Sequence, residues 1–85
     1  MNKLRYYRTK IDSIDRNIVK LLLFRFKIVK QIAHYKKINK INAIDKKREL
    51  EVVNNIKKYS NKSNQKFIIK IFKKVINYSK RLQSK

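Results

Sequence analysis

A long apolar repeat broken by one arginine constrains this chain more than any other feature of its sequence. The repeat has three-four spacing and consists of Leu4, Tyr7, Ile11, Ile14, Ile18, Leu21, Ile28, Ile32 and Tyr35. Arg25 occupies the slot between Leu21 and Ile28. A stripe with this spacing is the buried seam of a long helix. A guanidinium in such a seam is costly to desolvate unless an anion or a close partner meets it. The pattern therefore predicts a long helix that packs along its length, and a partner for Arg25.

The size and composition of the chain favour one small helical domain. Its 85 residues, 1–85, are near the size at which a lone hydrophobic core is marginal, so a second copy would supply missing burial. Glycine and proline are absent, and strand-type alternation is lacking, which predicts an all-α fold. Cysteine is absent too, which excludes disulfides and thiol chemistry. With no secretory signal and no apolar run long enough to span a bilayer, we expect a cytoplasmic protein.

The formal net charge of +20 raises the alternative of a basic helical module that binds nucleic acid. The basic residues are mostly lysines spread along the whole chain, however, and no single helix face is rich in arginine. Lysine, isoleucine and asparagine are all encoded by codons rich in adenine and thymine. Mutational drift toward such codons is therefore one explanation of the charge, and selection for binding a polyanion is the other.

The apolar spacing predicts three helices of long, short and medium length, at about 3–40, from 45 to about 59, and at about 66–82. The first would exceed roughly 50 Å, longer than a compact domain of this size is wide. Asp45 is the expected N-cap of the second helix, and Ser63 or Asn64 that of the third. The expected inner faces carry Leu50, Val53 and Ile56 on the second helix, and Ile68, Phe72, Val75, Ile76, Ser79 and Gln83 on the third.

Polar residues on these apolar faces are the candidate functional residues. Arg25 and Lys36 are eleven residues apart, so they point the same way at a separation of roughly 16 Å and can converge on an anion. Arg8 lies roughly 25 Å before Arg25, too far for one small ligand to reach both Arg8 and Lys36. If Arg8 joins the site, it most naturally comes from an antiparallel second chain. Ser79 and Gln83 extend the apolar stripe of the third helix and need polar partners when buried.

Each of these signals also has a simpler interpretation. Arg25 could pair with a carboxylate such as Asp15 of a partner helix, and Lys36 could be a solvated surface lysine. The run from Asp45 to Glu49 could serve only as a cap with surface ion pairs. Ser79 and Gln83 could lie at a fraying end. His34 has no companion histidine and is interpreted as a helix-surface residue, not a metal ligand or a base.

Taken in order, the residues resemble the all-helical (AroQ-type) chorismate mutase family. The matching string comprises Arg8, Ile11, Ile14, Asp15, Ile18 to Leu22, Arg25, Ile32, Ala33, Lys36, Asp45, Arg48, Glu49, Ser79 and Gln83. The resemblance covers nearly the whole chain. It implies an isomerase that converts chorismate to prephenate in phenylalanine and tyrosine biosynthesis, built as a homodimer of intertwined three-helix chains. No cofactor, metal or covalent intermediate is implied.

The resemblance also implies a role for each site residue. Arg25, and Arg8 from the other subunit, would clamp the substrate carboxylates, and Ser79 would contact one of them. Lys36 and Gln83 would flank the ether oxygen. Glu49, with the backbone of Asp45, would bind the ring hydroxyl, and Arg48 would help to orient Glu49 and the substrate side of the second helix. Ile32 and Ile76 would form apolar walls against the ring.

Three further expectations follow. Ile44 stands where some relatives carry a basic residue. The chain leaves no room for a fused domain, and for that reason we expect a monofunctional enzyme. Pyruvate elimination from isochorismate on a similar scaffold is an alternative, which the longer connector and the Asp45-to-Glu49 motif disfavour. A membrane-surface helix is a third alternative, but three apolar helix faces are better explained by packing on each other.

Overall fold

The computed structural model describes residues 2–84, and these residues form three helices and no strand: α1 (Lys3–Ile38), α2 (Lys46–Tyr59) and α3 (Gln65–Gln83). This confirms the all-α fold with its long, short and medium helices. α1 ends two residues before the expected position 40, and α3 is one residue longer at each end than the expected 66–82. None of the helices in the described range is long and apolar enough to cross a membrane.

Side-chain caps explain where two of the helices begin. The Asn2 side chain accepts hydrogen bonds from the backbone N–H groups of Leu4 and Arg5 at 2.9 and 3.3 Å. Asp45 caps α2 as expected, because its Oδ1 accepts the N–H of Arg48 at 3.0 Å. Asn64 stands at the N-cap position of α3 but makes no capping bond with its side chain.

α1 ends in a Schellman motif built without glycine. The N–H of Ile41 bonds to the carbonyl of Lys36 at 2.8 Å, and the N–H of Lys40 bonds to that of Lys37 at 3.4 Å. Lys40 adopts a φ of 56°, the left-handed conformation that glycine normally supplies. This turn stops the helix and sends the connector back toward α2.

Because Lys40 bears a side chain in a left-handed conformation, Lys40→Gly is expected to raise the free energy of unfolding by about 1 kcal/mol. Urea unfolding followed by circular dichroism measures the change. Lys37→Gly is the matched control: it lies inside α1 and should lower the stability by about 1 kcal/mol instead. A loss of stability in Lys40→Gly would contradict this account of the turn.

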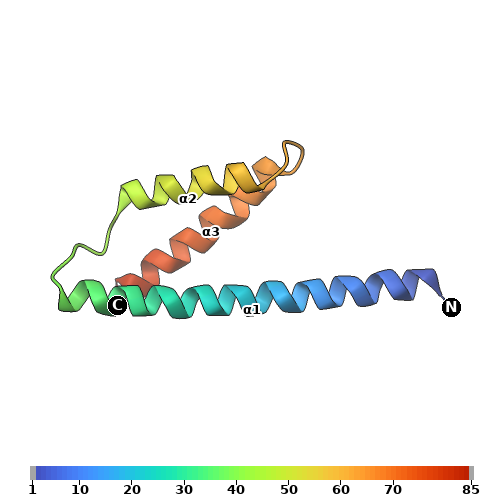
Figure 1. Ribbon diagram of the computed structural model, residues 1–85, viewed down its shortest axis with the longest axis horizontal. Helices are drawn as coiled ribbons and strands as arrows, with labels where there is room; N and C mark the ends of the chain where they lie inside the picture. Colours follow the sequence, from blue (N-terminus) through green and yellow to red (C-terminus); the bar gives the residue numbers. More distant parts are fainter. Residues whose placement is uncertain (1, 85) are drawn as a thin grey trace.

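α3 is the helix that holds the chain together. It packs against both α1 and α2, whereas in the described chain those two helices lie too far apart to pack directly on each other. Figure 1 shows α3 crossing diagonally from the end of α2 to the C-terminal half of α1. The N-terminal half of α1 extends beyond both, which makes the molecule elongated, at 59 × 26 × 15 Å.

The core of a single chain is very small. Among the described residues, Val29 and Val75 are the buried apolar side chains, and Ser79 is buried beside them. Phe26 and Tyr78 add an edge-to-face contact, with ring centroids 4.8 Å apart. So few buried side chains give little hydrophobic stabilisation for a chain of this length.

Most of the predicted apolar seam is exposed within one chain. Ile11 is 54% exposed and Ile18 50%, because neither α2 nor α3 reaches the N-terminal half of α1. Leu21, further along α1, lines an open cavity and is 69% exposed. The buried side of α1 runs instead through Val29. Leu50 was expected on the inner face of α2, but this prediction is wrong for the single chain, because Leu50 is 63% exposed. Val53 and Ile56 are half-buried, as expected.

Candidate active site

A cavity of about 400 Å³ opens between α1 and α2, with α3 as its floor. This volume suits a small organic molecule. Nine of the ten residues expected to bind substrate line it: Arg25, Ile32, Lys36, Asp45, Arg48, Glu49, Ile76, Ser79 and Gln83. Arg8 does not, because it lies exposed near the free end of α1. The fold therefore brings the predicted side chains of three helices and a connector to one cavity.

The C-terminal half of α1 supplies two cations to the cavity. Arg25 and Lys36 both line it, and both are half-buried, as their spacing on one face predicts. Lys36 is thus not a solvated surface lysine. His34 by contrast is exposed and outside this cavity, which agrees with its interpretation as a surface residue.

Arg25 meets a hydroxyl group within the chain. Its Nη1 donates to the Oγ of Ser79 at 2.7 Å, and Ser79 in turn donates to the carbonyl of Val75 at 2.8 Å. Ser79 is only 5% exposed, so it is not a frayed terminal residue. No ion pair joins Arg25 to Asp15 within residues 2–84. Within the described residues, no carboxylate therefore pairs with the guanidinium of Arg25.

Two physical effects disfavour this charge. Burial lowers the pKa of the Arg25 guanidinium below its usual value, and the nearby positive charge of Arg48 lowers that pKa further. Arginine nevertheless stays protonated in proteins. Placing two guanidinium groups together in a partly desolvated cavity destabilises the empty protein, and an anion bound between them would relieve the repulsion.

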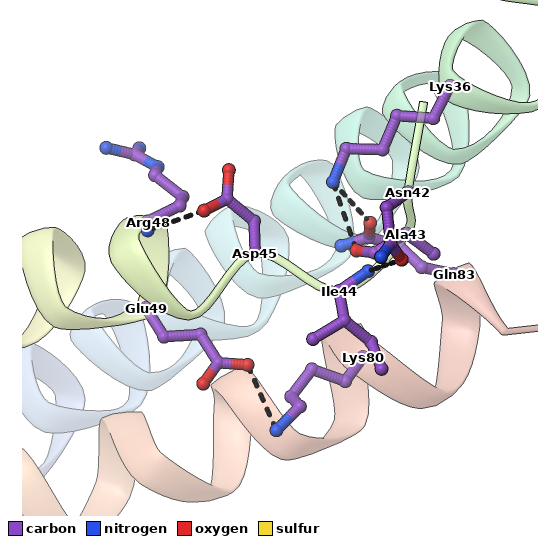
Figure 2. A network of polar contacts seen from close by, with 9 residues as sticks. All are labelled: Lys36, Asn42, Ala43, Ile44, Asp45, Arg48, Glu49, Lys80 and Gln83. Carbon is purple, nitrogen blue, oxygen red and sulfur yellow. Dashed lines mark hydrogen bonds and ion pairs between the residues drawn. The ribbon is translucent and has the colours of Figure 1, made fainter. Parts of the chain in front are cut away.

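Lys36 ties the connector to the end of α3, as Figure 2 shows. Its Nζ donates to the carbonyl of Ala43 and to the Oε1 of Gln83, both at 3.1 Å. Both acceptors are neutral groups, so neither of them forms an ion pair with Lys36. Because an ammonium has three N–H groups, one is left for a ligand. The amide NH₂ of Gln83 takes no part in the bond to Lys36, so it too can donate to a ligand.

The acidic residues lie at the first turn of α2. Asp45 holds that turn through its cap, and Glu49 pairs through Oε1 with the Nζ of Lys80 at 3.0 Å (Figure 2). This is the one ion pair among residues 2–84. Arg25, Lys36 and Arg48 therefore face the cavity without a carboxylate partner in the described chain.

The summed charge of the lining favours a dianion. Four cationic and two acidic side chains line the cavity, so two positive charges are left in excess. Apolar side chains complete the walls, among them Ile28, Ile32, Val52 and Ile76. Such a site can hold a small apolar ring that bears two negative groups.

Lys80 is the main site residue that the sequence interpretation missed. Ile76, Ser79, Lys80 and Gln83 share one face of α3 by helical spacing, and all four line the cavity. The sequence predicted Ile76, Ser79 and Gln83 from that face as site residues, but not Lys80. The carbonyl of Ala43 was also missed, since a backbone acceptor in a connector leaves no signal in the sequence.

Three helices around a small cationic cavity with apolar walls define an all-helical protein with a site for a small anionic molecule. The chain belongs to the chorismate mutase type II family, whose sequence pattern matches residues 7–84. It is also 35% identical over 85 residues to a chorismate mutase of Methanocaldococcus jannaschii, an alignment that covers 98% of this chain and 86% of that relative. The resemblance is thereby confirmed, and the comparisons support none of the alternative functions.

Proposed function

We propose that this chain catalyses the rearrangement of chorismate to prephenate, an isomerisation in aromatic amino-acid biosynthesis. The observation that carries the proposal is the cavity of about 400 Å³ with two excess positive charges, three unpaired cations and apolar walls. Chorismate is a small ring with two carboxylates, a hydroxyl and an ether oxygen, and these features match the lining. Family membership supports the same reaction.

The reaction needs positioning and electrostatics. One carbon–oxygen bond of the ether breaks as a carbon–carbon bond forms, within a single molecule held in a chair-like conformation. Holding that conformation removes much of the entropic part of the barrier. Negative charge develops on the ether oxygen as its bond breaks, so fixed donors aimed at that oxygen stabilise the transition state more than the substrate.

Lys36 and Gln83 are the proposed donors to the ether oxygen. Their hydrogen bond of 3.1 Å fixes them side by side. The side-chain carbonyl oxygen of Gln83 accepts a hydrogen bond from Lys36, which leaves the NH₂ group of Gln83 as a donor for the substrate. The third N–H of Lys36 is available as a second donor. Two donors, one of them charged, can thus meet one oxygen.

Arg25 is the proposed clamp for a substrate carboxylate, since a guanidinium matches a carboxylate in a bidentate geometry. Ser79 orients Arg25 by accepting its hydrogen bond, and its own proton goes to Val75. For Ser79 to contact the carboxylate as well, its hydroxyl must rotate away from Val75. At the other end, Glu49 and the Asp45 backbone are proposed to bind the ring hydroxyl. Within residues 2–84 Glu49 pairs with Lys80 and not with Arg48, so Arg48 is proposed to bind the substrate itself.

A homodimer that shares its active sites is the second part of the proposal, with one catalytic domain, 1–85, per chain. The exposed stripe on α1, including Ile11 and Ile18, needs a cover, and a chain with so small a core gains stability from a second copy. An antiparallel partner would bring its own Arg8 to the cavity and hold the second carboxylate.

The direct test is to mix the purified protein with chorismate and follow the loss of substrate absorbance and the appearance of prephenate. Turnover well above the uncatalysed rate, without added metal or cofactor, is expected. Folded protein that leaves chorismate unchanged would overturn the proposed function. Tight binding to duplex DNA at physiological salt together with no turnover would favour the nucleic-acid alternative.

A further inference from the structure

Lys80 forms the one ion pair of the described chain, and it forms it inside the candidate active site. Its Nζ lies 3.0 Å from Oε1 of Glu49, and both residues line the cavity. The pair links the first turn of α2 to the last turns of α3, which Figure 2 shows from close by. Nothing in the proposed chemistry uses Lys80 directly.

Stability is a weak explanation for this pair. The Lys80 side chain is 46% exposed and that of Glu49 29%, so water screens the attraction between them. Ion pairs with this exposure contribute little to folding. The pair must therefore be judged by what it does to the cavity.

Glu49 without Lys80 would compete with the substrate. Its carboxylate shares the cavity with Arg25, Lys36 and Arg48, which have no carboxylate partner of their own in residues 2–84. A carboxylate that is free to move would pair with one of these cations, as a bound substrate carboxylate does. Lys80 holds Glu49 on the α3 side, and because it occupies Oε1, the Oε2 atom is left to accept a hydrogen bond from a hydroxyl group.

We propose that Lys80 is a positioning residue that acts through Glu49: it keeps this carboxylate away from the cations that bind the substrate and aims its second oxygen at the ring hydroxyl. The inference rests on the proposed function, because it assigns Glu49 to the hydroxyl of chorismate. Lys80 lies beside Ser79 on the floor of the cavity, so the same turn of α3 orients both Arg25 and Glu49.

The test is a set of variants assayed with chorismate. Lys80→Met is expected to raise KM about fivefold with little change in kcat, because the ring hydroxyl is bound equally in the substrate and the transition state. Lys80→Arg keeps the cation and should restore most of the loss. Lys74→Met is the matched control, since Lys74 is exposed on α3 outside the cavity, and its KM should equal that of the wild type.

The double variant distinguishes an effect of Lys80 through Glu49 from a direct contact of Lys80 with the substrate. In a Glu49→Gln background, Lys80→Met should have no further effect on KM, because the carboxylate that Lys80 positions is gone. The same increase in KM with and without Glu49 would overturn the inference and make Lys80 a direct contact of the substrate. Equal KM values for Lys80→Met and the wild type would overturn it too. Inactive wild-type protein would instead refute the proposed function.

Discussion

Arg25→Ala is expected to lower kcat/KM about a thousandfold, because it removes the guanidinium that clamps a substrate carboxylate inside a partly desolvated cavity. The helical content should stay close to that of the wild type. Arg25 has one hydrogen-bond partner in the chain, the Oγ of Ser79, and that oxygen keeps its bond to the carbonyl of Val75. Steady-state kinetics and circular dichroism on the same sample measure both quantities.

Stability should move in the opposite direction from activity at this position. Arg25 is held near Arg48 and is partly buried, so its charge costs the empty protein free energy. Arg25→Met keeps the length of the side chain without the charge, and we expect it to raise the unfolding midpoint while it abolishes turnover. The matched control is Arg16→Ala, which removes an exposed arginine of α1 outside the cavity and should change neither quantity. Wild-type kinetics in Arg25→Ala would refute its assigned role.

Lys36→Ala should reduce kcat about a thousandfold, since this ammonium is the charged donor proposed for the ether oxygen. The loss should fall mainly on kcat, because the negative charge on that oxygen is present only in the transition state. The variant also loses the bonds to Ala43 and Gln83, so the connector and the end of α3 should become less protected against hydrogen exchange.

The neighbouring residue gives a matched control for Lys36. Lys37 is exposed at the end of the same helix and outside the cavity, so Lys37→Ala should retain wild-type kcat. If Lys36→Ala raised KM alone and left kcat intact, Lys36 would bind the substrate without stabilising the transition state. The electrostatic part of the proposal would then be wrong.

The positions of the helices could be predicted from the sequence because the signals are local. Three-four spacing marks the length of each helix, and Asp45 is a strong cap that begins α2 where expected. The end of α1 was misplaced by two residues, because the turn there uses Lys40 in a left-handed conformation. Without a glycine at that point the sequence carries no stop signal.

The members of the cavity were also predictable, since helical spacing places Arg25 with Lys36 and Ser79 with Gln83. Their partners were not. That Arg25 bonds to Ser79, and that Glu49 bonds to Lys80, depends on how α3 crosses the other two helices. Crossing geometry is a tertiary property that spacing along one helix does not encode.

Burial was the least predictable property. The apolar stripe of α1 predicts a covered seam, yet Leu21 is 69% exposed in the single chain. Leu50 is exposed as well. An apolar periodicity shows that a helix face needs a partner, but it does not show whether that partner belongs to the same chain or to another one. The exposed stripe is therefore an argument for a second copy.

A site shared between two chains is tested most directly by mixing two inactive variants. Arg8→Ala and Arg25→Ala are each prepared alone, and both are then unfolded and refolded together in equal amounts. A mixed dimer has one site with neither substitution, because Arg25 of one chain meets Arg8 of the other. We predict nearly inactive separate variants and a mixture with about a quarter of the wild-type activity. A mixture that stays inactive, although mass spectrometry shows that mixed dimers have formed, would contradict the shared site.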